Sequence, residues 1–197
     1  MGFDCIKTEH NNFFFHISFI GISRKYCHVF SFLSLGRKGT GFLKESIDVE
    51  KVSVAGKGSF EASEWLVNPA ATTRLRVVIV YRPPYSVKHP VSTSTIITEF
   101  SDYLESLVMS SEPLLILGDF NIHMDLHDDT DCRKMSDLLV SMGLKQHILQ
   151  PTHELGHTLD LIITHISDNI IAGRPYTGEL FSDHFPEIGR ASCRERV

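Results

Sequence analysis

The order of apolar and polar residues predicts an α/β or α+β fold with a layered sheet core. Short apolar runs bounded by Gly and Pro alternate with two segments whose apolar residues recur at helical spacing. Residues 75–81 form a nearly continuous apolar run and residues 114–117 an unbroken one, which is typical of strands covered on both faces. Such strands together with amphipathic helices indicate a sheet with further layers packed against it.

The composition fits one globular domain and excludes several classes of protein. The chain has 197 residues, 42% of them hydrophobic, and a formal net charge of -5, so a polyanion would need a local binding site. The four cysteines form no CxxC pair, which argues against a disulfide framework or a thiolate zinc site and favours an intracellular protein. The apolar run at residues 13–22 is too short for a membrane helix, and no basic n-region precedes it, so neither an anchor nor a secretion signal is expected.

The first part of the chain predicts strands. Residues 1–35 show no clear period, and we assign them no structure. Residues 42–46 and 49–54 are predicted as two short strands, which a hairpin would join. Residues 64–67 and 75–81 are predicted as two further strands, and the second ends where two prolines follow it, because proline cannot continue a β-ladder.

The second part of the chain predicts two helices and two strands. Apolar residues recur at helical spacing over residues 96–108 and again over residues 135–142, where Gly143 is a natural helix stop. Residues 114–117 are predicted as a buried strand between these helices. Residues 159–164 are predicted as another buried strand after them.

Polar residues follow two of the predicted strands directly. Gly118 permits a tight turn, so Asp119 and Asn121 emerge at the carboxyl end of a buried strand, where open α/β sheets build their sites. Tyr81 and Arg82 take the same position on their own strand. Because strand exits share one edge of a sheet, we expect these residues to converge on one rim. Asp and Asn also serve ordinary turns, so this segment alone leaves both interpretations open.

The segment HELGH matches the H-E-x-x-H pattern of zinc metalloproteases. That mechanism requires a helix, because helical spacing places His153 and His157 on one metal with Glu154 as general base. Pro151 and Gly156 argue against a helix here, as do the β-branched residues that follow. A zinc metalloprotease is therefore kept only as an alternative.

A distributed set of polar residues favours phosphodiester chemistry. Asp119 and Asn121, then Asp160, then residues 182–184 (Ser-Asp-His) offer carboxylate, amide and imidazole groups at the ends of different elements. Phosphodiester hydrolysis needs carboxylates for a hard divalent cation, a group that orients or deprotonates water, and donors for the charge of the transition state.

Six ordered motifs give the chain a specific family resemblance. They are GTGFL (39–43), RLRVVIVYRPP (74–84), LLILGDFNIH (114–123), PTH (151–153), GHTLDLIIT (156–164) and SDHFP (182–186). In this order the series resembles the endonuclease/exonuclease/phosphatase family, and within it the endonuclease domains of non-LTR (LINE-type) retrotransposons. The resemblance implies a four-layer fold of two packed mixed sheets flanked by helices, and magnesium-dependent cleavage of nucleic-acid phosphodiesters.

The resemblance also implies roles for individual residues. Asp119 resembles the aspartate that orients or deprotonates water, and Asn121 the asparagine that holds both this aspartate and the phosphate. Asp183 resembles the aspartate that binds Mg²⁺ and pairs with the histidine. His184 resembles the histidine that contacts the scissile phosphate, and Asp160 a supporting catalytic carboxylate.

Three further residues and the partners follow from the same resemblance. Tyr81 resembles a catalytic tyrosine on the phosphate side, and Thr152 and Arg82 are expected to bind substrate. The expected partner is the target strand of DNA, with a fused reverse transcriptase in the full element. We expect a monomer without membrane association, and a nuclear location if the protein is functional.

The chain departs from the family pattern at both ends. The family carries a strand end with a Glu, its principal magnesium ligand, upstream of the GTGFL motif, and we find no counterpart. Residues 1–35 therefore stay unassigned, and residues 36–186 are read as a partial domain. Residues 187–197 can be read as the translation of a common short-read sequencing adapter. We accordingly expect a non-native tail there, which packs poorly, and no strand after the SDH motif.

These departures predict a truncated copy with little or no nicking activity. Magnesium usually keeps one or two protein carboxylates, so loss of the glutamate leaves Asp183 and Asp160 as the nearest candidates. A folded but inert remnant is one open alternative. A family phosphatase that acts on a small or lipid phosphate is another. The motifs YRPP and GHTLDLIIT, however, resemble those of the retroelement members.

Overall fold

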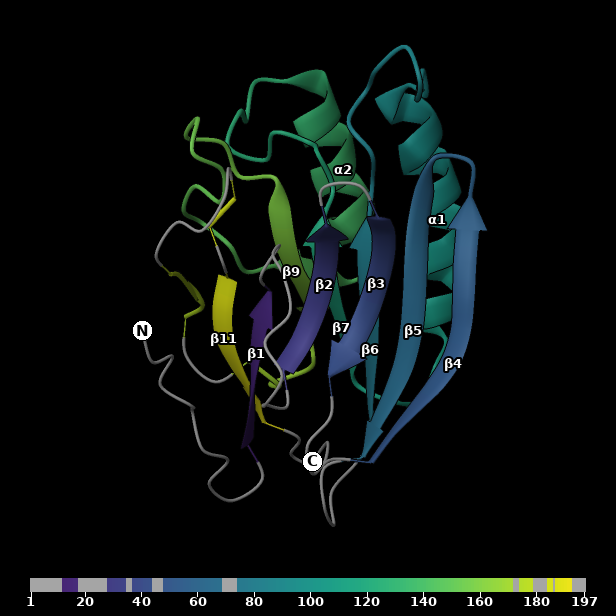
Figure 1. Ribbon diagram of the computed structural model, residues 1–197, viewed down its shortest axis with the longest axis vertical. Helices are drawn as coiled ribbons and strands as arrows, with labels where there is room; N and C mark the ends of the chain where they lie inside the picture. The colour runs from purple at the N-terminus through teal and green to yellow at the C-terminus, as the bar shows by residue number, and fades with distance from the viewer. Residues whose placement is uncertain are drawn as a thin grey trace.

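A mixed six-stranded sheet forms the centre of the computed structural model (Figure 1). The structure describes residues 12–17, 28–34, 37–43, 48–68, 74–171, 174–178, 184–185 and 187–192. The sheet has the order β4-β5-β6-β7-β9-β8. Its strands are β4 (Asp48–Lys57), β5 (Phe60–Asn68), β6 (Leu75–Tyr81), β7 (Leu114–Asp119), β8 (Leu144–Gln146) and β9 (Asp160–His165). Only β6 and β7 run parallel; the other neighbouring pairs are antiparallel.

Two amphipathic helices cover one face of this sheet. They are α1 (Thr93–Val108) and α2 (Thr130–Ser141), and both were predicted. The hydroxyl of Ser92 caps α1 and the carboxylate of Asp129 caps α2, in each case by accepting hydrogen bonds from backbone N–H groups of the first turn. After α2, Gly143 adopts a left-handed conformation (φ 66°). Neither helix is long and apolar enough to cross a membrane.

A second set of strands lies on the other face of the sheet. It consists of β1 (Asn12–Ile17), β2 (His28–Ser34), β3 (Arg37–Leu43), β10 (Tyr176–Thr177) and β11 (Glu187–Ser192). In Figure 1 these strands stand in front of the main sheet, and both helices stand behind it. The α/β class is therefore confirmed. The described residues supply three of the four expected layers, because none of their helices covers the outer side of the second set.

The strand pairing at both ends of the chain differs from the prediction. The expected hairpin between residues 42–46 and 49–54 does not form, because β3 pairs with β2 and β4 pairs with β5. β4 and β5 are joined by residues 58–59, and two residues is the commonest length of a hairpin connection. β11 forms where no strand was expected and pairs with β1. Backbone groups alone can make such a ladder. We predicted that these end segments pack poorly, and the side chains that would test this lie outside the described residues.

Each face of the main sheet carries its own apolar cluster. On the helix side, residues of α1 and α2 such as Phe100 and Met135 pack against alternate residues of the strands, including Ile116. The opposite cluster contains the other alternate residues, including Leu115 and Ile162. All six residues of β7 are buried, as the unbroken apolar run predicted. The end of β7 is therefore a rigid platform for polar groups.

His147 predicts a specific loss of stability in acid. Its Nε2 shares a 2.8 Å hydrogen bond with the hydroxyl of Thr164, and burial lowers its pKa to about 4, with a further contribution from Lys145. Because the unfolded chain binds this proton from about pH 6.5 downward, the stability is present above that pH and is lost as the pH falls toward 4. We expect the free energy of unfolding to fall by about 1–2 kcal/mol between pH 7.5 and pH 5 through this group.

Urea denaturation of the protein and of its His147→Gln variant at both pH values measures this effect. The variant should lose less stability than the parent over the same interval. Equal losses in the two proteins would show that His147 is not responsible.

Candidate active site

Three polar residues form one row across the main sheet, where β6 and β7 end. Asp119, the last residue of β7, pairs with Asp160, the first residue of β9, and on its other side with Tyr81, the last residue of β6. In-register residues of neighbouring strands project to the same face. Leu117 and Ile162, two positions away along their strands, belong to the apolar cluster opposite the helices. The row therefore opens toward the face on which β2 and β3 lie.

Gly118 allows β6 and β7 to approach each other beside this row. It lies inside β7, not in the predicted turn, with a φ of 149° that side chains rarely allow. A Cβ atom at this position would lie 1.9 Å from the carbonyl oxygen of Val80. Glycine is therefore required by close backbone contact.

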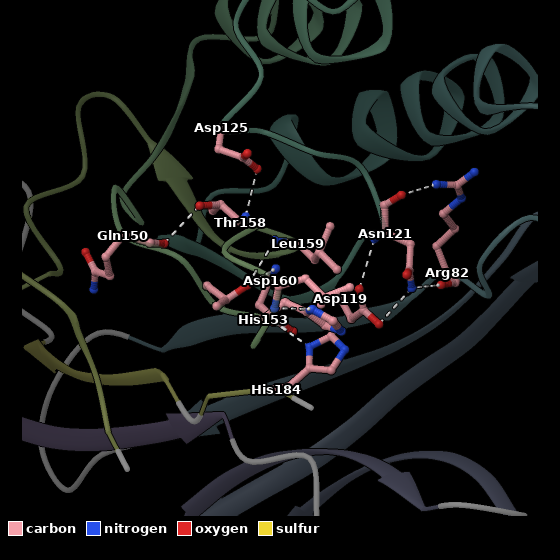
Figure 2. A network of polar contacts seen from close by, with 12 residues as sticks. Arg82, Asp119, Asn121, Asp125, Gln150, His153, Thr158, Leu159, Asp160 and His184 are labelled. Atoms are coloured by element: carbon pink, nitrogen blue, oxygen red, sulfur yellow. Dashed lines mark hydrogen bonds and ion pairs between the residues drawn. The ribbon is translucent and has the colours of Figure 1, made fainter. Parts of the chain in front are cut away.

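Asn121 holds both oxygens of the Asp119 carboxylate. Its backbone N–H donates to Oδ1 over 2.9 Å, and its side-chain Nδ2 donates to Oδ2 over 2.8 Å (Figure 2). The same Nδ2 also donates to the carbonyl oxygen of Arg82 over 2.8 Å. Asn121 has a φ of 48°, a left-handed conformation that Asn tolerates better than most residues. The motif GDFN thus encodes a fixed carboxylate.

Arg82, predicted to bind substrate, is a buried positioning residue in the structure. It is only 3% exposed. One guanidinium nitrogen donates to the carbonyl oxygens of Phe120 and Asn121, over 3.3 and 2.5 Å, and the other to the hydroxyl of Thr93 over 3.2 Å. Its backbone N–H donates to the carbonyl oxygen of Asp119. The side chain turns inward because these backbone oxygens need donors, so Arg82 fixes the segment that carries Asp119 and Asn121.

His184 pairs with Asp160. Its Nδ1 lies 2.8 Å from Oδ2 of the fully buried carboxylate. The prediction gave the histidine-pairing role to Asp183, which lies outside the described residues; here Asp160 takes that role. His153 supports the imidazole with an edge-to-face ring contact, 4.9 Å between centroids.

Thr152, also predicted to bind substrate, anchors the start of β9 in the structure. Its hydroxyl oxygen accepts hydrogen bonds from the backbone N–H groups of Leu159 and Asp160, over 2.9 and 3.0 Å. The residue is fully buried, because these two donors at the strand end would otherwise lack a partner. Its carbonyl oxygen accepts a hydrogen bond from the N–H of Phe185, which ties the segment after His184 to the same place.

The H-E-x-x-H segment forms a turn, so the zinc alternative loses its structural basis. The backbone N–H of Gly156 donates to the carbonyl oxygen of His153, and the N–H of His153 donates to the carbonyl oxygen of His157. The two imidazoles serve different neighbours. His153 contacts His184, while His157 lies 3.1 Å from the carboxylate of Asp125.

Burial keeps a proton within the cluster near neutral pH. Burial and the negative charge of Asp160 raise the pKa of Asp119 well above its usual range, although His184 and Asn121 oppose this. Burial also raises the pKa of Asp160, and His184 opposes it. Burial raises the pKa of the Tyr81 hydroxyl, as do Asp119 and Glu61. Tyr81 therefore stays protonated and can act as a hydrogen-bond donor.

The described residues do not complete a magnesium site. They contain no group of three or more His, Cys, Asp or Glu side chains that could hold a metal ion. At the cluster, both oxygens of Asp119 accept hydrogen bonds from Asn121, and Oδ2 of Asp160 is taken by His184. Octahedral oxygen ligation needs more than these two engaged carboxylates. We therefore assign no chemical step to a metal.

Comparison with known proteins identifies the family. Residues 75–188 match the model of a family described as endonuclease-reverse transcriptase. The chain belongs to this family. The match spans the ends of β6, β7 and β9 and His184, so it contains the whole cluster described above. No curated protein matches this chain.

Solved structures share its fold at low sequence identity. The endonuclease domain of TRAS1, a telomere-specific non-LTR retrotransposon, is 14% identical with a TM-score of 0.57, over 79% of this chain and 73% of that one. The human Nocturnin catalytic domain is 16% identical with a TM-score of 0.56, over 77% and 62%. D. rerio TDP2 complexed with single-strand DNA product is 12% identical with a TM-score of 0.53, over 92% and 77%. These likenesses confirm the fold of this chain.

The structure brings together most of the predicted site and adds one residue. Tyr81, Asp119, Asn121, Asp160 and His184 lie at one end of the main sheet, whereas Asp183 lies outside the described residues. The added residue is His153, which sequence reasoning considered only as a zinc ligand. Its place in the PTH motif was the available signal.

Proposed function

We propose that this chain cuts phosphodiester bonds of DNA with Asp119, Asn121, Asp160 and His184. The observation that carries the proposal is the His184–Asp160 pair, set beside an Asp119 carboxylate that Asn121 holds at both oxygens. These residues come from segments far apart in the chain, yet they share one end of one sheet. If the GDFN motif served only a turn, the His184–Asp160 pair beside it would have no explanation.

The geometry supports a division of tasks between the two buried aspartates. Asp160 binds Nδ1 of His184 and thereby orients the imidazole ring, whose Nε2 can donate to a phosphate oxygen when it carries a proton. Asp119 is held in one orientation, as a group that orients or deprotonates water must be. Because the pKa of Asp119 is raised, its ionised form is a stronger base than an ordinary carboxylate.

The family and the fold support DNA as the substrate. The family is described as endonuclease-reverse transcriptase, and the TRAS1 neighbour is the endonuclease domain of a retrotransposon. We propose that the nick serves a reverse transcriptase in the same element, and therefore that it is made in the nucleus. A Mg²⁺ requirement, with Asp183 among the ligands, belongs to the proposal as well.

Plasmid nicking tests this proposal. With Mg²⁺, supercoiled plasmid should be converted slowly to open circles, and EDTA should stop the conversion. The rate should be low, because the incomplete carboxylate set costs several kcal/mol of barrier and each ~1.4 kcal/mol is a factor of ten. Excess protein and long incubation compensate, since one nick relaxes a whole plasmid.

Two outcomes would contradict the proposal. Release of inorganic phosphate from a phosphate monoester, without plasmid nicking, would favour the phosphatase alternative. Zinc-dependent cleavage of casein that is lost on changing His153 and His157 would favour the protease alternative. Fast nicking with Mg²⁺ would support the proposed chemistry and would contradict only the expected low rate.

A further inference from the structure

The connection between β6 and α1 exposes apolar side chains beside the active site. Val87 is 99% exposed and Tyr85 is 70% exposed, and Lys88 between Val87 and His89 is exposed as well. We call residues 83–92 the rim turn. In Figure 1 this connection rises at the same end of the sheet as the one that follows β7.

The rim turn is a closed, stiff structure. The backbone N–H of Ser86 donates to the carbonyl oxygen of His89 over 3.2 Å, and the N–H of His89 donates back over 3.0 Å. This bridge leaves Val87 and Lys88 at the tip. Three residues of the rim turn are prolines (Pro83, Pro84 and Pro90), and they fix the backbone angle φ on both sides of the tip. Little conformational entropy is therefore left to lose on binding.

The base of the rim turn is fastened to the catalytic cluster. The guanidinium of Arg82 donates to the hydroxyl of Thr93, so the residues just before and just after the turn are joined. The same guanidinium donates to the carbonyl oxygen of Asn121, and the backbone N–H of Arg82 donates to the carbonyl oxygen of Asp119. The tip is thereby held in a fixed position relative to the Asp119 carboxylate.

We propose that the rim turn is a contact surface for the DNA duplex beside the scissile phosphate. This inference rests on the proposed function. Val87 would press into a groove, as apolar wedges do at base steps, Tyr85 would pack against sugar or base, and Lys88 would pair with a backbone phosphate.

The distribution of charge favours a duplex on this side of the rim. The connection after β7 is acidic, and Asp128 and Asp129 there are exposed. These carboxylates repel phosphates, whereas Lys88 on the rim turn attracts them. A duplex whose scissile phosphate reaches His184 is thus directed toward the rim turn. A protein partner would not require this continuity with the catalytic cluster.

Fluorescence anisotropy with a labelled DNA duplex in EDTA, where no cleavage occurs, tests the inference at several salt concentrations. The double variant Tyr85→Ser/Val87→Ser should bind about tenfold or more weakly with the same salt dependence, because stacking and apolar contacts are lost. Lys88→Ala should lower the salt slope by about one unit. Met109→Ser, an equally simple change of an 85% exposed residue at the other end of α1, should bind like the parent.

The outcomes separate this inference from the proposed function. If the parent binds the duplex and the rim-turn variants bind equally well, the rim turn is not a DNA contact and the proposed function stands. If the folded parent binds no duplex, this inference fails, and the plasmid-nicking assay with Mg²⁺ decides the proposed function separately. Circular dichroism confirms that each variant is folded, and these exposed positions leave the core untouched.

Discussion

Alanine at Gly118 should prevent the protein from folding. The added Cβ would lie 1.9 Å from the carbonyl oxygen of Val80, and this neighbour is backbone inside a buried parallel strand pair. Neither strand can move away, since β7 is buried along its whole length. The φ of 149° adds backbone strain. We expect a loss above about 4 kcal/mol, a large part of the total stability of a domain.

Gly156→Ala is the matched control for this change. Gly156 also has a positive φ, 86°, but a Cβ there would meet nothing within 4 Å. This variant should lose only about 1 kcal/mol, the strain of the left-handed backbone. Circular dichroism and urea denaturation measure both proteins. A Gly118→Ala variant as stable as Gly156→Ala would show that β6 and β7 do not approach as described.

Alanine at His184 or at Asp119 should reduce plasmid nicking to the level of buffer alone. Each change removes one half of the cluster, either the imidazole that Asp160 orients or the carboxylate that Asn121 holds. A positioned acid or base contributes about 10²–10⁴ in rate, and groups that act as one unit lose that factor together. Because the parent is expected to be slow, protein in excess over plasmid is required.

His127→Ala is the control for this second prediction. His127 is exposed, lies in the connection after β7, and has no role in the cluster. This variant should nick plasmid as fast as the parent. If His184→Ala also nicks at the parent's rate while both variants are folded, the cluster is not the site of hydrolysis.

Local signals in the sequence predicted most of the central sheet. The apolar runs of β6, β7 and β9 were found because covered strands have no polar side, and prolines or Gly mark their ends. The two helices were found because their apolar residues recur at helical spacing. The pairing of β2 with β3 and of β1 with β11 was missed, because strand pairing depends on contacts between distant segments.

The site residues were easier to predict than their tasks. Asp119 and Asn121 adjoin in sequence, so their contact is local. The partner of His184 could not be read from its neighbour in the SDH motif, because Asp160 arrives from another strand. Arg82 and Thr152 were expected to face substrate, and both are buried because backbone groups at the strand ends need their donors and acceptors.

The most direct test of the central claim is the ¹⁵N signal of the His184 side chain, identified among 11 histidines by its absence in His184→Ala. We predict a protonated Nδ1 whose signal changes in Asp160→Asn, and an Nε2 signal that shifts when a short DNA duplex is added. This response would place the imidazole, its buried aspartate and the phosphodiester in one unit. A His184 signal that changes neither in Asp160→Asn nor on addition of the duplex would contradict the account.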